Sequence, residues 1–128
     1  MLIHVTGAKG ILGKCTTEAL GALGEVHGTD MDDMDITDAE SVMATLQARP
    51  PDVMVHLAAL KGNQPSRERP LDFFRVNTGG TVNLLEACRQ LEVGRFVFVS
   101  SLTVHGPNEG PVTEEGSWDP IHPYAGSQ

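Results

Sequence analysis

The chain has 128 residues and a formal net charge of -8 at pH 7, with 9 Lys or Arg against 17 Asp or Glu. This length allows one domain with a single core and leaves no room for a separate substrate domain. The acidic balance argues against nucleic acid or an anionic membrane as a partner, because the phosphates of both would be repelled. The first residues lead directly into a strand and no apolar stretch is long enough to cross a bilayer, so we expect a cytoplasmic protein without a signal peptide.

An apolar run, Leu2–Val5, is followed at once by Gly7, Gly10 and Gly13 in the sequence G-A-K-G-I-L-G. The pattern predicts a buried strand, a glycine turn and a helix that begins where the turn ends. Such a helix directs its unpaired N–H groups and the positive end of its dipole at one place, which suits a pyrophosphate. The chain is therefore expected to bind a nucleotide cofactor.

The helix after this turn is predicted over 11–23, because small and apolar residues recur there four apart. They are Ile11, Cys15, Ala19 and Leu23. Cys15 thus lies on an apolar face, and Cys88 has a similar setting in a later helix, so both are expected to be buried, reduced thiols. A phosphate loop of the NTPase type is the weaker alternative, since it would need a glycine at Ala8 and a hydroxyl at Cys15.

The rest of the chain alternates between predicted strands and helices. Further strands are predicted over 25–29, 53–57 and 96–100, and further helices over 38–47 and 71–91. This alternation predicts an α/β fold, a Rossmann-like, doubly wound parallel sheet with helices on both faces. The segment between Thr29 and Thr37 is too short for a crossover helix, so the third strand of the usual nucleotide-binding half is shortened or absent.

Two local signals refine the later helices. Thr37 and Glu40 form a predicted capping box at the start of the helix over 38–47. In the helix over 71–91, the pair Gly79-Gly80 costs stability, which predicts close packing against the sheet or a ligand. The same helix carries one stripe of small and apolar residues, which are Phe73, Val76, Gly80, Leu84 and Cys88.

Asp30 follows the second predicted strand and lies twenty residues after Gly10. At this position an acid can accept hydrogen bonds from the adenosine ribose, and its charge would repel a 2′-phosphate. The cofactor is therefore expected to be NAD, with NADP as the less favoured choice. The alternative is that Asp30 is an ordinary loop aspartate among several.

Hydroxyl groups follow the last predicted strand, at Ser100, Ser101 and Thr103. They lie at the carboxyl edge of the sheet, where open α/β folds bind ligands, although such serines also commonly cap a turn. Tyr124, the only tyrosine, could exchange a proton with a substrate hydroxyl. A phenol ordinarily has a pKa of about 10, so base catalysis at neutral pH would need a nearby cation.

Taken together, these motifs resemble the N-terminal, cofactor-binding part of an extended short-chain dehydrogenase/reductase of the NAD-dependent epimerase/dehydratase family. The resemblance covers the whole chain. The matching motifs are V-T-G-A-K-G-I-L-G from Val5, D-I-T-D from Asp35, H-L-A-A from His56, V-N-T-G-G-T-V-N-L-L-E-A-C from Val76, V-S-S-L-T-V-H-G from Val99 and P-Y-A-G-S from Pro123. The family acts mostly on nucleotide sugars, so the resemblance implies a small hydroxyl or carbonyl substrate of that class.

The resemblance also implies a role for individual residues. The pyrophosphate would be held by Gly7, Gly10, Ile11, Leu12 and Gly13. Asp30 would bind the ribose, and the adenine would lie beside Asp35 and Ile36. The cofactor groove would be lined by Leu57, Ala58, Ala59 and Lys61.

Toward the reacting end, the resemblance implies that Asn77 supports the geometry of the active site and belongs to the cofactor-binding set. Ser101 and Thr103 would hydrogen-bond the substrate, with Ser101 as a catalytic residue. Tyr124 would be the acid/base and would also contact the cofactor. His105 replaces a tyrosine that is common at its position in the family.

The chain departs from the family at Gln128, where the family has a lysine four residues after the tyrosine. A neutral amide does little to stabilise a phenolate. We therefore consider two hypotheses. In the first, the chain is part of a longer oxidoreductase that transfers hydride between a sugar carbon and NAD, followed by epimerisation, dehydration or release of the ketone. In the second, it is a module that binds NAD(P) or a nucleotide without turnover. A regulatory protein that senses the NADH/NAD ratio is a third, weaker possibility.

The histidines and the expected assembly complete the analysis. His4 and His56 fall in predicted core strands and are expected to be packed, hydrogen-bonded residues. His27, His105 and His122 do not cluster with acids at the spacing of metal ligands, so no metal is predicted. The family commonly pairs through a helix bundle, and the resemblance implies a homodimer for a full-length protein.

Overall fold

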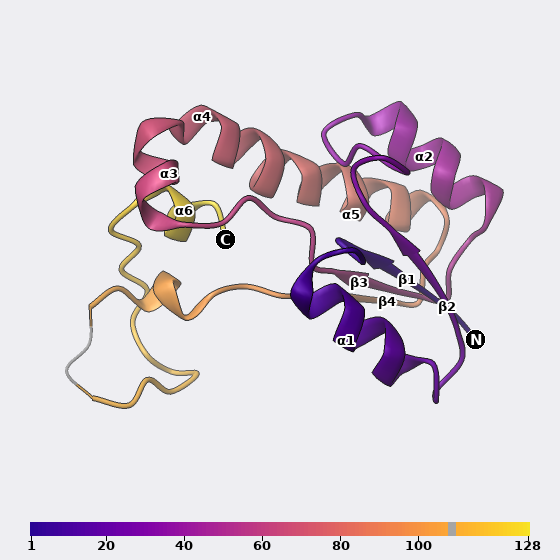
Figure 1. Cartoon of the computed structure of the whole chain (residues 1–128), viewed down its shortest axis with the longest axis horizontal. Helices are drawn as coiled ribbons and strands as arrows, with labels where there is room; N and C mark the ends of the chain where they lie inside the picture. Colours follow the sequence, from indigo (N-terminus) through magenta and orange to yellow (C-terminus); the bar gives the residue numbers. More distant parts are fainter. Residues whose placement is uncertain (108–109) are drawn as a thin grey trace.

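The computed structural model describes residues 1–107 and 110–128. Within these residues, four parallel strands form one sheet in the order β2-β1-β3-β4. The strands are β1 (Leu2–Thr6), β2 (Glu25–Thr29), β3 (Val53–His56) and β4 (Arg95–Phe98). All four strands run in one direction, so their carboxyl ends meet at one edge, to which the helices and loops of the candidate site are attached (Figure 1).

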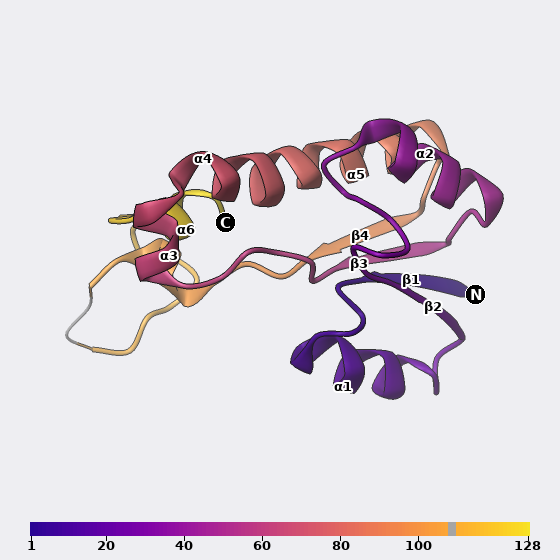
Figure 2. The same cartoon turned by 45° about the horizontal axis from the view of Figure 1, so that its top comes forward.

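Helices cover both faces of this sheet, as Figure 2 shows. The helix α1 (Ile11–Leu20) lies on one face, and α2 (Ala39–Ala48) and α5 (Gly80–Gln90) lie on the other. This arrangement confirms the predicted doubly wound, Rossmann-like fold. The segment 30–37 forms turns instead of a strand, as its length predicts.

Shorter helical segments complete the described chain. They are α3 (Asn63–Glu68), α4 (Pro70–Phe73), the π-helix η1 (Phe74–Gly79), the 3-10 helix η2 (Leu102–His105) and α6 (Pro123–Gly126). The predicted helix over 71–91 is present as the continuous run α4-η1-α5, but its middle is a π-helix. The C-terminal α6 packs beside α3 and α4, although it lies far from them in the sequence (Figures 1 and 2).

The core is unequal on the two faces. On the side of α2 and α5, one cluster of buried residues joins the sheet, both helices and the segment 30–37; its members are Met34, Ile36, Val42, Leu46, Met54, Val76, Leu84, Ala87 and Cys88. On the side of α1, the buried cluster consists of Ile3, Val5 and Val55. His4 and His56 point to the larger side and are buried and hydrogen-bonded, which confirms the prediction for both.

The prediction for α1 was wrong in two respects. The helix ends at Leu20, and the apolar stripe faces away from the sheet, with Ile11 83% and Leu23 65% exposed. Cys15 is consequently exposed, whereas Cys88 is buried as expected. The reason is that α1 packs through Gly13, which lies against Gly7 and Ala8 of the glycine turn, and through Leu20, which packs on the cluster of Ile3, Val5 and Val55.

Two smaller predictions also need correction. The N-cap of α2 is Asp38, whose carboxylate accepts from the Glu40 N–H at 2.9 Å, while the Thr37 hydroxyl donates to Asp35. Thr37 therefore bonds to the side chain of Asp35 in the preceding turn and does not cap the helix. Gly80 is closely packed, since an added Cβ would lie 2.6 Å from a methyl carbon of Ile36, but the neighbour is the segment 30–37 and not the predicted sheet, and Gly79 has no contact of that kind within the described residues.

Candidate cofactor site

The glycine turn after β1 is built by two close approaches. Gly7 has a φ of +69°, a left-handed conformation that favours glycine, and an added Cβ would lie 2.9 Å from the Ala58 nitrogen. An added Cβ at Gly13 would overlap the Gly7 carbonyl oxygen. The turn is thus pressed between the start of α1 and the segment that follows β3, and both positions require glycine.

This packing leaves the start of α1 open to an anion. The amides of Ile11, Leu12 and Gly13 belong to the first turn of the helix, where no preceding helical carbonyl can accept from them. Gly10 is the N-cap and has no side chain with which to cap them. The site thus fits the predicted contact with a pyrophosphate.

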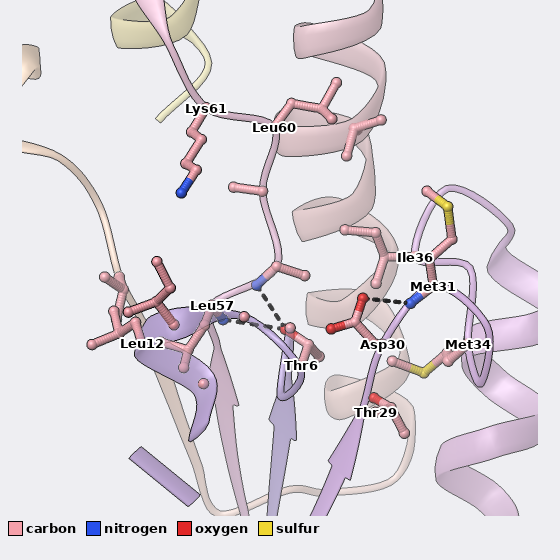
Figure 3. A pocket seen from close by; sticks show the side chains of 18 of the residues that line it. Thr6, Leu12, Thr29, Asp30, Met31, Met34, Ile36, Leu57, Leu60 and Lys61 are labelled. Carbon is pink, nitrogen blue, oxygen red and sulfur yellow. Dashed lines mark hydrogen bonds between the residues drawn. The ribbon is translucent and has the colours of Figure 1, made fainter. Parts of the chain in front are cut away.

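Asp30 lies beside this turn, just beyond the end of β2. Its carboxylate accepts from the Lys9 N–H at 3.0 Å and from the Met31 N–H at 2.9 Å. The Met31 bond is visible in Figure 3. Two oxygens with defined orientation are therefore presented to the pocket, and further lone pairs remain available for hydroxyl donors.

A small charged cluster adjoins Asp30 on the solvent side. The Lys9 ammonium lies 3.1 Å from an Asp33 carboxylate oxygen and 3.3 Å from an Asp32 oxygen. Hydrogen bonds to Asp33 and then Asp32 raise the pKa of Lys9, and the bond from Lys9 is the largest cause that lowers the pKa of Asp33. The surroundings of Asp30 thus carry more negative than positive charge at neutral pH.

Turn, strand ends and loops together enclose a pocket of about 700 Å³. Its volume falls in the range usual for cofactor sites. Of the cofactor-binding residues predicted from the sequence, all except Asn77 line it; they are Gly7, Gly10, Ile11, Leu12, Gly13, Asp30, Asp35, Ile36, Leu57, Ala58, Ala59, Lys61 and Tyr124. Figure 3 shows the Lys61 side chain directed from the segment after β3 toward the pocket.

The pocket also includes residues that sequence reasoning missed. Among them are Thr6 and Thr29, at the carboxyl ends of β1 and β2, and Met31 and Met34 in the turns after β2. The rule that ligands bind at the carboxyl edge of a parallel sheet could have identified the two threonines. The methionines had no such signal, because the conformation of the segment 30–37 was not predictable.

Tyr124 brings the C-terminal part of the chain to this pocket. The tyrosine ring contacts the Phe73 ring edge-on at 6.2 Å between centroids and stacks on the His122 ring at 6.1 Å. Gln128 and Ser100 line the pocket as well. An aromatic hydroxyl and the glycine turn thus share one cavity although they come from opposite ends of the sequence.

Ser101 and Thr103 do not belong to the lining of the pocket. Ser101 caps η2, and its oxygen accepts from the Thr103 hydroxyl at 2.9 Å and from the Thr103 N–H at 3.3 Å. Ser101 therefore does cap a turn, which was the alternative considered from the sequence. These two bonds do not use the hydroxyl proton of Ser101, so a role toward a substrate stays a prediction.

Asn77 is buried behind the pocket wall, in the π-helix η1. Its side-chain oxygen accepts from the Leu60 N–H at 2.7 Å, and its nitrogen donates to the Leu60 carbonyl at 3.0 Å and to the Ser127 hydroxyl at 2.9 Å. The amide thus joins the segment after β3 to α6, the helix that carries Tyr124. Asn77 does not line the pocket, and its role in supporting the active site stays a prediction.

The family model of the NAD dependent epimerase/dehydratase family matches residues 3–128. The chain belongs to this family. A UDP-glucose 4-epimerase of Drosophila melanogaster is 42% identical over 101 residues, which cover 77% of this chain and 29% of that protein. The chain therefore spans less than half the length of the curated relatives it matches.

Solved structures of family members have the same fold. A UDP-glucose 4-epimerase of Thermus thermophilus in complex with NAD superposes with a TM-score of 0.91 at 32% identity, over 99% of this chain and 47% of that one. A dTDP-4-dehydrorhamnose reductase of Bacillus anthracis in complex with NADP has a TM-score of 0.90 at 25% identity, over 98% and 45%. Within the described residues, no helix is long and apolar enough to span a membrane.

Proposed function

We propose that this chain binds NAD in the pocket described above. The unpaired amides at the start of α1 would hold the pyrophosphate, and the Asp30 carboxylate would accept from the adenosine ribose hydroxyls. NAD is favoured over NADP because Asp30 and the neighbouring Asp32 and Asp33, which share one Lys9, would repel a 2′-phosphate. Relatives with bound NAD, including the Thermus thermophilus epimerase, support this choice.

Calorimetry tests this binding directly. We expect the chain to bind NAD with micromolar affinity and NADP at least about tenfold more weakly. Gly13→Ala should abolish NAD binding, because the added Cβ would collide with the Gly7 carbonyl. Gly110→Ala is the matched control, since an added Cβ there meets no atom of the described residues within 4 Å. Equal affinity of the Gly13→Ala variant for NAD would refute the site.

We further propose that the protein acts on a nucleotide sugar as an epimerase, dehydratase or reductase. When bound, NAD would accept a hydride from a sugar carbon, and Tyr124 would take or return the proton of the hydroxyl on that carbon. Ser101 would donate its free hydroxyl proton to the same oxygen, while Thr103 fixes the Ser101 oxygen. The single observation that supports this best is that Tyr124 lines the same cavity as the glycine turn.

Gln128 favours one alternative, a module that binds NAD(P) without turnover. It lines the pocket as a neutral amide, and among the lining residues that the structure describes, the basic side chain is that of Lys61. A spectroscopic experiment separates the two functions. In a longer form of the protein, addition of a UDP-hexose to the NAD complex should produce the absorbance of reduced nicotinamide if Tyr124 is catalytic, and Tyr124→Phe should abolish that signal. Tight NAD binding by that longer form without the signal would identify the module, whereas NAD binding without turnover by the 128-residue chain alone fits a part of a longer enzyme.

We also propose that a longer form of the protein is a homodimer. The run α4-η1-α5 carries an outward stripe of exposed apolar residues, namely Leu71, Phe74, Val82 and Leu85. Leu71 and Phe74 are three residues apart, as are Val82 and Leu85, so each pair lies on one face of the run and could pack against another helix. Sedimentation of the longer form should show a dimer, and Val82→Glu should give a monomer that still binds NAD.

A further inference from the structure

A chain of buried polar groups crosses the core beneath the pocket and has His56 at its centre. His56 is the last residue of β3, and its side chain lies between β1 and α5. Its Nδ1 is 2.7 Å from the Thr6 hydroxyl, and its Nε2 is 3.0 Å from the Thr81 hydroxyl. One imidazole therefore joins the ends of two strands to the helix on the larger side of the core.

The donor and acceptor of every hydrogen bond in this network can be assigned by starting at the main-chain carbonyl of Asn77. The Asn77 carbonyl can only accept, so the Thr81 hydroxyl donates its single proton there, at 2.5 Å. Thr81 can then only accept from His56, which requires the proton on Nε2. Burial lowers the pKa of His56 to about 4, so the ring is neutral at pH 7 and Nδ1 accepts from the Thr6 hydroxyl.

Both ends of the segment 57–60, which lines the pocket, depend on this chain. Having donated to His56, the Thr6 oxygen accepts from the N–H groups of Leu57 and Ala58, at 3.2 Å each (Figure 3). The Ala58 nitrogen is the atom against which Gly7 packs. At the other end, the Leu60 N–H and carbonyl bond to the side-chain amide of Asn77. The main-chain carbonyl of the same Asn77 accepts the Thr81 proton.

We propose that His56 is a positioning residue for the cofactor pocket, which fixes the segment 57–60 between the glycine turn and Asn77 of the π-helix η1. The role needs a side chain that accepts on one side and donates on the other, across the width of the core. A neutral imidazole protonated on Nε2 meets this need, whereas an apolar residue of similar volume would leave the Thr6 hydroxyl proton without its acceptor and the Thr81 oxygen without its donor. The effect on cofactor affinity rests on the proposed binding of NAD.

The test combines a tautomer measurement with a matched pair of variants at Thr81, which is not among the residues that line the pocket. Long-range proton–nitrogen NMR spectra should show His56 neutral at pH 7 with its proton on Nε2. Thr81→Val removes the hydroxyl and should raise the hydrogen-exchange rate of the Ala58 N–H and weaken NAD binding about tenfold. Thr81→Ser keeps the hydroxyl and should restore both values to near those of the wild type.

The outcomes separate this inference from the proposed function. A proton on Nδ1, or a charged ring at pH 7, would overturn the inference whatever the variants do. Equal Ala58 exchange in Thr81→Val and Thr81→Ser would also overturn it. If the wild type fails to bind NAD, the proposed function is wrong, and the tautomer and the Ala58 exchange still decide whether His56 positions the segment.

Discussion

The two faces of the sheet differ in how completely they are packed. On the side of α2 and α5, nine buried apolar residues form one cluster, and the buried histidines lie among them. On the side of α1, three buried residues form the cluster. Val97 in the edge strand β4 and Val99 just after it remain 40% and 39% exposed. The difference indicates that the larger side supplies the stability and holds the pocket walls, whereas the α1 side supplies the open helix start.

The strongest way to test this comparison is through the two buried histidines of the larger side. Burial lowers the pKa of both His4 and His56 from 6.5 to about 4, with the charges of His27 and then Arg49 as further causes for His4. Below pH 6.5 the unfolded chain therefore binds protons that the folded chain does not, and stability falls as the pH falls. Each histidine contributes about 1.4 kcal/mol per pH unit between pH 6.5 and 4, so the loss at pH 5 should be about 4 kcal/mol.

Urea unfolding followed by circular dichroism at pH 7, 6 and 5 measures this loss. His4→Asn removes one of the two contributions and should reduce the slope between pH 6 and 5 by about half. A slope that His4→Asn leaves unchanged would show that His4 does not contribute to the acid sensitivity.

Truncation of one leucine is the next largest effect. Leu84 in α5 is fully buried in the larger cluster, so Leu84→Ala should lower the free energy of unfolding by about 3 kcal/mol. The neighbouring Leu85 is 46% exposed, and Leu85→Ala should cost about 1 kcal/mol or less. Thermal and urea unfolding measure both values. Similar losses for the two variants would contradict the assignment of stability to the α2 and α5 side.

The start of α2 tests a single hydrogen bond on the same side. Asp38 accepts from the Glu40 N–H as the N-cap, whereas Thr37 bonds to Asp35 outside the helix. Asp38→Ala should therefore destabilise the protein by about 1 kcal/mol. Thr37→Ala should cost clearly less, and the reverse order in urea unfolding would restore the capping box that the sequence predicted.

The sequence predicts most of the fold because its strongest signals are local. The glycine turn, the apolar runs and the alternation of strand and helix each depend on neighbouring residues, and so does the absence of a crossover helix after Asp30. The face that α1 buries does not follow from such signals. Gly13 packs against the glycine turn and Leu20 packs on the sheet, and neither belongs to the predicted stripe, so the stripe led to the wrong face.

The candidate site shows the same division. Residues of the turn and of the segment after β3 could be predicted because each follows a strand whose carboxyl end meets the same edge. The network around His56 could not, because it joins residues from four separate elements through bonds that no spacing encodes. The distinction between Ser100, which lines the pocket, and Ser101, which caps η2, likewise depends on the path of the chain after β4.

The smallest expected effect on stability concerns the exposed surface of the α1 side. Leu23 and Val97 are exposed there, so Leu23→Gln and Val97→Thr should change the free energy of unfolding by about 0.5 kcal/mol or less. Apolar surface without a covering partner promotes association, and the double variant should therefore reduce the concentration-dependent self-association of the 128-residue chain in sedimentation. Val82→Thr, in the α5 stripe proposed above for pairing, measures how much of the self-association this second apolar surface carries. If Val82→Thr alone abolishes association, the contact lies on the α5 side, and the α1 side is not the surface through which this chain associates.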